Sequence, residues 1–472
     1  MKTLISGGTV VNATGRAPAD VLVDGETVAA VLAPGSTALG VDLAAHVDQV
    51  IDATGKYVVP GGVDAHTHME MPFGGTSASD TFATGTTAAA WGGTTTIVDF
   101  VVQYPEQNVL DQYAAWHEKA AGSCAVDYGF HQILSDVQDS SLHAMDELIA
   151  EGVTSFKLFM AYKGVFLSDD GQILRAMQKA ADNGALMMMH AENGAVIDVL
   201  VQQALAAGNT APVFHGLTRP WQAEAEATSR AIMLADLTGA PLYVVHVSAK
   251  QAVEQIALAR DRGQNVFGET CPQYLYLSLE EQLGAPGFEG AKWVCSTPLR
   301  SRAEGHQDHM WQALRTNDLQ LVSTDHCPFC MKDQKEMGVG DFSKIPNGIG
   351  SVEHRMDLMY QGVVSGRISL ERWVEICSVT PARMFGMYGR KGVVAPGADA
   401  DIVIYDPAGH TSIGLGKTHH MNMDYSAWEG FEIDGHVDTV LSRGTVLVTG
   451  GEFVGRVGHG RYVKRDLTQY LV

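Results

Sequence analysis

The sequence predicts a (β/α)8 barrel that carries a small β-domain built from both ends of the chain. In the middle of the sequence, eight apolar strand candidates alternate with helical segments, which is typical of a parallel sheet. At both ends, short strand candidates are instead separated by Gly and Pro turns. Repeats of this number within about 250 to 400 residues favour a closed barrel. The pattern alone leaves an open doubly wound sheet as the alternative.

The two end segments share one pattern. Residues 1–56 hold short apolar runs such as 20–23, and similar runs such as 401–405 return near the other end. Each set alone would make a poor core, so we expect the two sets to build one β-domain. The predicted division is residues 1–56 and 390–472 for this domain and residues 57–389 for the barrel.

The barrel strand candidates follow one another at regular intervals. They cover residues 58–68, 94–102, 126–134, 155–161, 185–190, 241–248, 266–274 and 321–325. Helical segments follow most of them: the segment 80–91 begins with an Asp cap, and the segment 172–183 stops at Gly184. No Gly-x-Gly-x-x-Gly turn follows the first strand and no Gly-Lys-Ser/Thr loop is present, so the sequence shows no cradle for a nucleotide cofactor.

Composition excludes several classes of partner. The 472 residues carry a formal net charge of −22, which would repel nucleic acids and anionic membranes. No run is long enough to cross a bilayer, and the first residues run into Gly7-Gly8 rather than into a signal peptide's apolar core, so we expect a cytoplasmic protein. The six cysteines are too sparse for a disulfide framework, and we assign no chemistry to the pair Cys327 and Cys330.

Metal-ligand residue types stand at the ends of the predicted barrel strands. His66 and His68 end the first strand and project from one face, because side chains alternate along a strand. Alone, such a pair is more often two polar residues where a strand meets its loop. His190, His246 and Asp325 end three further strands, and in a barrel these ends meet at one mouth. Four imidazoles and a carboxylate exceed the needs of one tetrahedral zinc, so the set suffices for two ions.

Lys157 in the fourth strand candidate needs a separate explanation. An ammonium group among metal ions would be repelled. By itself, a lysine here would more often lead its charge to the surface or pair with a carboxylate.

Six segments together resemble the signatures of dihydropyrimidinases and D-hydantoinases, a family of cyclic amidohydrolases. The segments lie at residues 61–68 (Gly-Gly-Val-Asp-Ala-His-Thr-His), 155–159, 190–193, 245–248, 324–329 and 346–348. They occur in the family's order, and the end segments match the family's split β-sandwich. The resemblance therefore implies the same barrel, and a homotetramer.

The resemblance also implies the chemistry. Lys157 would carry a carbamate, as N6-carboxylysine, that bridges two divalent ions, most often zinc. One ion would be held by His66, His68 and Asp325, and the other by His190 and His246. A hydroxide between the ions would then open the ring amide of dihydropyrimidines or 5-substituted hydantoins, giving N-carbamoyl amino acids.

Further residues match family positions for catalysis and substrate binding. Asp325 would act as general base and then acid, and the Tyr162 hydroxyl would stabilise the oxyanion. Ser296 and Asn347 would fix the cyclic imide, largely through backbone groups, although turn chemistry would also explain them. The group projecting from the ring would contact apolar side chains that could equally serve packing, namely Met71, Phe159 and Phe166. Ala161 and Thr297 depart from the usual family residues and affect the shape of the pocket.

Three rival functions remain to be weighed. Dihydroorotases use an arginine near the His-x-His motif. This chain has no arginine between Arg16 and Arg175, so a dihydroorotase function is disfavoured. An allantoinase-like or other cyclic ureide hydrolase is less expected but stays open. Collapsin response mediator proteins share the fold as non-enzymatic binding partners but have lost metal ligands, whereas every ligand position is occupied here. The physiological substrate and enantiomer preference stay undetermined by the sequence.

Overall fold

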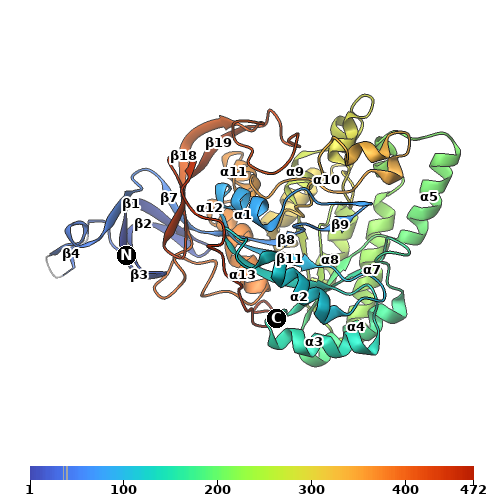
Figure 1. Ribbon diagram of the computed structural model, residues 1–472, viewed down its shortest axis with the longest axis horizontal. Coiled ribbons are helices and arrows are strands. Elements are labelled where there is room, and N and C mark those ends of the chain that lie inside the picture. The colour runs from blue at the N-terminus through green and yellow to red at the C-terminus, as the bar shows by residue number, and fades with distance from the viewer. Residues whose placement is uncertain (36, 39–40, 472) are drawn as a thin grey trace.

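The computed structural model describes residues 1–35, 37–38 and 41–471. Figure 1 shows a barrel surrounded by helices, with a β-domain at one side of it. Eight parallel strands form the barrel sheet in chain order. They are β8 (Gly62–Thr67), β11 (Thr94–Val101), β12 (Asp127–Ile133), β13 (Ser155–Phe159), β14 (Leu186–His190), β15 (Leu242–Val244), β16 (Val266–Thr270) and β17 (Leu321–Val322).

The barrel closes between its first and last strands. Thr67, at the end of β8, forms a parallel bridge with His326, which follows β17. The backbone N–H of His68 donates to the carbonyl of His326 at 2.8 Å. This closure confirms the predicted barrel and excludes the open sheet.

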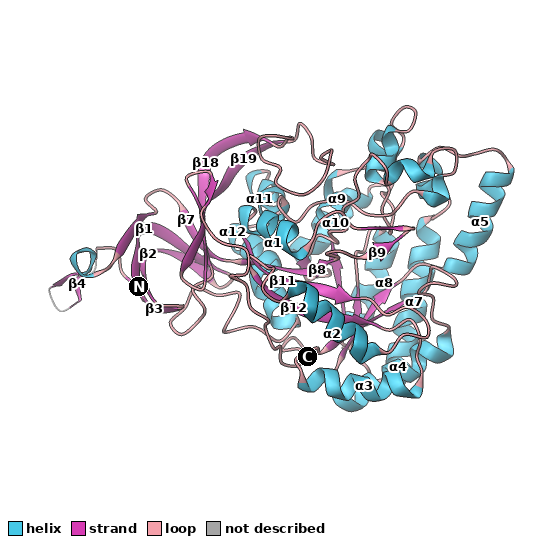
Figure 2. Ribbon diagram, viewed as in Figure 1, coloured by secondary structure: helices cyan, strands magenta, loops and turns pink. Residues whose placement is uncertain are grey.

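Helices alternate with the strands and cover the outside of the barrel (Figure 2). The longer ones are α1 (Phe82–Trp91), α2 (Val109–Ala120), α3 (Asp139–Ala150), α4 (Asp170–Asn183), α5 (Gly194–Ala206), α7 (Trp221–Thr238), α8 (Lys250–Asp261), α10 (His306–Thr316) and α11 (Arg355–Val364). Short helices are α6 (Val213–Leu217), α9 (Pro272–Tyr276), α12 (Leu370–Val374) and α13 (Thr380–Met384). No helix within the described ranges is both long and apolar enough to span a bilayer.

Strands from both ends of the chain share one hydrogen-bonded sheet, as predicted. The N-terminal strands are β1 (Lys2–Asn12), β2 (Gly15–Asp24), β3 (Thr27–Leu32), β6 (Gln49–Asp52) and β7 (Tyr57–Pro60). The C-terminal strands are β18 (Ile402–Ser412), β19 (Glu432–Ser442), β20 (Thr445–Thr449) and β21 (Glu452–Phe453). The two sets meet where β7 pairs with β18, and they bury their own apolar cluster around Val21, Val58 and Ile402. The division at residues 1–56, 57–389 and 390–472 stays a prediction.

The first predicted barrel strand, residues 58–68, is two strands in the structure. β7 belongs to the β-domain and β8 to the barrel, and the chain passes between them at Gly61. A side chain at Gly61 would collide with Thr95, since a Cβ there would lie 2.1 Å from the Thr95 hydroxyl oxygen. Two loops each contain a pair of very short strands. β9 (Pro72–Phe73) pairs with β10 (Thr76–Ser77), and β4 (Thr37–Ala38) pairs with β5 (Val41–Asp42).

Candidate active site

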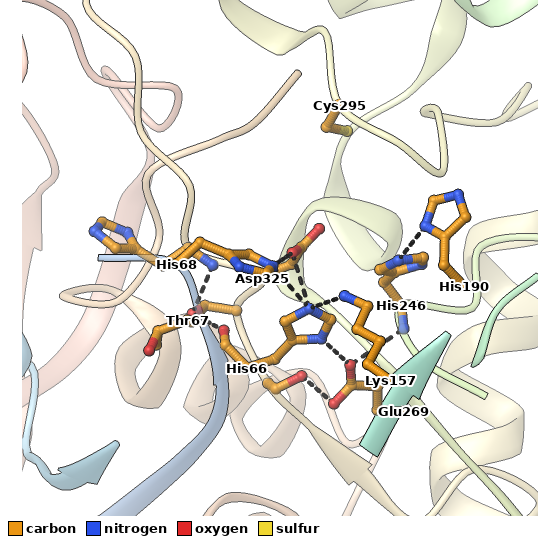
Figure 3. A network of polar contacts seen from close by, with 12 residues as sticks. His66, Thr67, His68, Lys157, His190, His246, Glu269, Cys295 and Asp325 are labelled. Carbon is orange, nitrogen blue, oxygen red and sulfur yellow. Dashed lines mark hydrogen bonds and ion pairs between the residues drawn. The ribbon is translucent and has the colours of Figure 1, made fainter. Parts of the chain in front are cut away.

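The six predicted metal ligands meet at one mouth of the barrel, because the parallel strands all end there. Each lies in a barrel strand or within three residues of its end: His66, His68, Lys157, His190, His246 and Asp325. Figure 3 shows His66 between Asp325, Lys157 and Glu269, with His190 and His246 paired beside them.

His66, His68 and Asp325 form the first group. The Nε2 atom of His66 lies 3.2 Å from Nε2 of His68 and 3.1 Å from Oδ1 of Asp325. The same Asp325 oxygen lies 3.3 Å from Nε2 of His68. One ligand atom from each residue thus lies within 4.8 Å of the other two.

His190 and His246 form the second group. Nδ1 of His190 lies 2.9 Å from Nε2 of His246. The other ring nitrogen of His190 lies 2.9 Å from the carboxylate of Glu192, and this contact orients the imidazole. The ring centroids of His66 and His246 are 5.6 Å apart, so the two groups are adjacent.

Lys157 joins the first group from β13. Its Nζ lies 3.0 Å from Nε2 of His66, and the residue is only 1% exposed. Among the described residues, it forms no ion pair with a carboxylate within 4.0 Å. Burial lowers the pKa of Lys157 to about 8, against the attraction of Asp325 and Glu269. At neutral pH, a far larger fraction of Lys157 is therefore in the neutral amine form than of an exposed lysine.

Burial sets the charge state of the other ligands. It lowers the pKa of His66, His68 and His246, so these imidazoles are neutral and carry a free lone pair. Burial alone would raise the pKa of Asp325, but the contacts with His66 and His68 and the positive charge of Lys157 hold it at about 2. Lone pairs and a carboxylate that converge in a buried space need a shared cation, so this donor set fits divalent metal ions.

Three site residues at this mouth have a strained backbone. Tyr162, His246 and Asp325 adopt φ values of 64°, 39° and 52°, in the left-handed region that residues other than glycine rarely adopt. Such conformations cost about 1 to 3 kcal/mol each and persist where the surrounding structure enforces them.

The cavity at the mouth is lined by all six residues predicted to contact substrate, which are Tyr162, Ser296, Asn347, Met71, Phe159 and Phe166. The side-chain amide of Asn347 donates to the hydroxyl oxygen of Tyr162 at 3.3 Å and to that of Ser296 at 3.1 Å. These bonds hold the Tyr162 hydroxyl in the cavity. Phe73, which the sequence analysis missed, packs edge-on against Tyr162 with ring centroids 5.5 Å apart.

Glu269 in β16 is a second residue that the sequence analysis missed. Its Oε1 lies 2.5 Å from Nδ1 of His66 and accepts the backbone N–H of His246 at 3.2 Å. The hydroxyls of Tyr243 and Ser323 donate to its other oxygen. Glu269 thus turns the Nε2 atom of His66 toward the first group. The available signal was a lone carboxylate within an otherwise uncharged strand candidate.

Lys335 is a third residue that the sequence analysis missed. Its buried ammonium group donates to the carbonyls of Val294 at 2.9 Å, Pro346 at 2.7 Å and Gly348 at 2.9 Å. Two of these carbonyls flank Asn347, so Lys335 fixes the loop that presents the Asn347 side chain. Nothing in the sequence around Lys335 indicated this role.

Comparison with known proteins places the chain in a family. The amidohydrolase family matches residues 57–447. A D-hydantoinase from Streptomyces coelicolor is 62% identical over 470 residues, covering 100% of this chain and 99% of that protein. A D-hydantoinase from Geobacillus stearothermophilus is 48% identical over 467 residues, covering 98% and 97%. The crystal structure of dihydropyrimidinase from Brevibacillus agri superposes with a TM-score of 0.95 at 50% identity, covering 99% of both chains. The chain belongs to the amidohydrolase family, in the group formed by D-hydantoinases and dihydropyrimidinases.

Proposed function

We propose that this protein is a hydrolase that opens the ring amide of 5-substituted hydantoins and dihydropyrimidines, giving N-carbamoyl amino acids. The observation that carries this proposal is the convergence of four histidines, Asp325 and Lys157 at the barrel mouth, where all but His66 line the cavity that holds the Tyr162 hydroxyl. The names of the relatives favour hydantoins of the D configuration.

The proposal includes two zinc ions. His66, His68 and Asp325 would hold one ion, and His190 and His246 would hold the other. The amine of Lys157 would add to carbon dioxide with loss of a proton, and the resulting carbamate would serve both ions as an anionic ligand. When bound, the ions supply a hydroxide nucleophile at neutral pH and polarise the scissile carbonyl.

The chain's own residues would transfer the proton and stabilise the negative charge that develops during the reaction. Asp325 is ionised at neutral pH, since its pKa lies at about 2, and it can accept the proton of the attacking water and return it to the leaving ring nitrogen. Burial raises the pKa of Tyr162 to about 12, so its hydroxyl stays protonated and can donate to the carbonyl oxygen as negative charge develops there. Backbone groups of Ser296 and Asn347 would orient the ring.

The cavity walls favour an uncharged ring with an apolar substituent. Met71, Phe73, Phe159 and Phe166 line the cavity, and its described lining contains no arginine that could pair with a substrate carboxylate. This argues against dihydroorotate. It also gives an aromatic group at position 5 of a hydantoin an apolar surface to contact.

Turnover on zinc-loaded protein tests the proposal. Dihydrouracil, hydantoin, both enantiomers of phenylhydantoin, allantoin and dihydroorotate should be compared side by side. We expect ring opening of D-phenylhydantoin or dihydrouracil to be the fastest, with little reaction of dihydroorotate. Preference for allantoin or dihydroorotate would contradict the proposed substrate class. If the protein binds no zinc and opens none of these rings, the result would instead support the alternative function of a non-enzymatic binding protein.

We also propose that the protein is a cytoplasmic homotetramer, as its family resemblance implies. Light scattering behind size-exclusion chromatography should give about four times the 50.5 kDa mass of the chain. A monomeric mass would contradict the proposed assembly without affecting the proposed chemistry.

A further inference from the structure

A second group of metal-ligand side chains lies outside the catalytic mouth. Glu353 and His354 directly precede α11, and His419 lies in the loop that connects β18 with β19. Figure 1 shows α11 beneath this part of the β-domain. One potential ligand atom of each of the three residues lies within 4.8 Å of the others. Neither the proposed reaction nor the family motifs use these residues.

Within the described residues, three ring nitrogens of the two imidazoles of this group are buried without a hydrogen-bond partner, although His419 as a whole is only half-buried. His354 is 2% exposed, and its Nε2 has no hydrogen-bond partner among the described residues. Both ring nitrogens of His419 are likewise buried and unpaired there. The two rings face the same space, with centroids 6.2 Å apart. Burying a polar atom without a partner costs about 1 to 3 kcal/mol, so three such atoms at one place indicate a missing ligand.

Charge and protonation suit a cation. Burial lowers the pKa of His354 to about 3, and burial also lowers the pKa of His419, so both imidazoles offer lone pairs at neutral pH. Glu353 supplies the negative charge: burial raises the pKa of its carboxyl group, and the contacts with His420 act against that rise. Its two oxygens contact Nδ1 of His420 at 2.5 Å and the backbone N–H of His420 at 2.6 Å. Since a carboxylate has about four lone-pair sites, Glu353 keeps lone pairs free for a cation shared with the two imidazoles.

The group is preorganised and lies beside a cavity. The His420 ring stacks on Trp91 with centroids 3.9 Å apart, and together with its bonds to Glu353 this contact holds His419 in place. Glu353 and His354 also border a cavity of about 390 Å³, which is large enough for several water molecules.

We infer that Glu353, His354 and His419 bind one divalent transition-metal ion, of which zinc is the best match to two imidazoles and a carboxylate, with water from the cavity as fourth ligand. The ion joins the β18–β19 loop to the start of α11. That loop also reaches the catalytic mouth, because the backbone N–H of Asn422 donates to Asp80 at 2.9 Å and Asp80 lies 3.0 Å from Nε2 of His326. The site is structural, and it supports the chain segment that carries Asp325.

The test counts metal ions in three full-length proteins: wild type, His419→Ala and His410→Ala. Within the described part of the chain the His419 side chain makes no hydrogen bond, so we expect its removal to leave the metal-free fold intact. His410→Ala is the matched control, since His410 lines the same cavity but its ring nitrogens contact Glu432 and Asp434 instead. After removal of metal by a chelator, each protein is titrated with Zn²⁺ and the bound ions are counted by calorimetry and elemental analysis.

We expect His419→Ala to bind one ion fewer per chain than wild type and His410→Ala. The zinc-induced rise in melting temperature should also be smaller in His419→Ala than in wild type. Equal ion numbers in the three proteins would overturn the inference and would mean that water alone fills the space. Because the result is a difference between variants, it does not depend on how many ions the barrel mouth holds.

Discussion

Substitution of Lys157 tests the proposed chemistry most directly at the scale of a single residue. It lies buried beside His66 and, within the described residues, has no carboxylate within ion-pairing distance. We expect Lys157→Ala to abolish turnover and to lower the metal content, because the anionic ligand shared by the ions is lost. Circular dichroism should show an intact fold. Lys163→Ala, which removes an exposed lysine six residues away, serves as control and should behave as wild type. Full metal content and turnover in Lys157→Ala would refute the bridging role.

Tyr162 tests the stabilisation of the developing oxyanion. Tyr162→Phe removes one hydroxyl and keeps the ring that packs against Phe73. We expect kcat to fall by about 10² to 10³, the usual cost of losing one oxyanion donor, with the metal content unchanged. Steady-state kinetics and elemental analysis on the same preparation measure both quantities. An unchanged kcat would show that another group stabilises the oxyanion.

At the scale of single residues, the candidate metal ligands could be predicted from the sequence, but the residues that hold the site in place could not. His66, His190 and His246 each interrupt an apolar strand at its end, and this position is visible in the sequence. Among the described residues, Lys335 donates only to the backbone carbonyls of Val294, Pro346 and Gly348, so no side-chain pattern reveals it. Glu269 was visible as an isolated carboxylate, but its contact with His66 depends on the closure of the barrel.

At the scale of elements, β11 holds the end of β8 through Asp99. This buried carboxyl group accepts hydrogen bonds from the Thr67 hydroxyl and the Met69 N–H, both at 2.8 Å, on either side of His68. Burial raises the pKa of Asp99 to about 7, although these donors and Trp116 lower it. Since the folded pKa lies above the unfolded value of 3.8, Asp99 contributes stability that is fully present below pH 4 and is lost as the pH rises through about 7.

Asp99→Asn should remove this pH dependence. Between pH 4 and 7, we expect the free energy of unfolding of wild type to fall by about 3 kcal/mol relative to the variant. Denaturant unfolding of both proteins at several pH values measures the difference, and the effects of all other titrating groups cancel in the comparison. Parallel pH profiles would show that Asp99 is already ionised at pH 4 in the folded protein.

Strand and helix types could be predicted because apolar runs and Gly or Pro turns are local signals, whereas some boundaries depend on distant contacts. The run 58–68 reads as one strand, but β7 pairs with β18, more than 340 residues away in sequence, and β8 pairs with β11. The predicted Asp80 cap of α1 was wrong. Thr81 caps that helix, and the Asp80 carboxylate instead contacts His326 and Asn422.

At the scale of the whole molecule, a buried ion-pair network fastens the β-domain to the barrel. The Lys391 ammonium lies 2.6 Å from Asp127 in β12 and 2.7 Å from Asp401 beside β18. Arg443, in the turn between β19 and β20, contacts the same Asp127 carboxylate at 3.1 Å. These pairs add to the apolar contacts through which Val59, Val403 and Val440 of the β-domain join the core of the barrel.

Lys391→Met should destabilise the protein by about 3 to 5 kcal/mol, because it leaves Asp127 and Asp401 buried without their shared cation. Lys464→Met is the matched control. It removes an exposed ion pair with Glu151, which contributes about 0 to 1 kcal/mol. Thermal unfolding of both variants measures the contrast. Equal melting temperatures would mean that Lys391 does not hold the two domains together.

The most direct test of the central claim is ring opening by metal-free and zinc-reloaded protein, with the product identified by mass spectrometry. We expect the metal-free protein to be inactive, and zinc to restore conversion of D-phenylhydantoin or dihydrouracil to the N-carbamoyl amino acid. The Asp325→Asn variant should stay inactive after reloading. Equal turnover with and without metal, or a product other than the N-carbamoyl amino acid, would contradict the account.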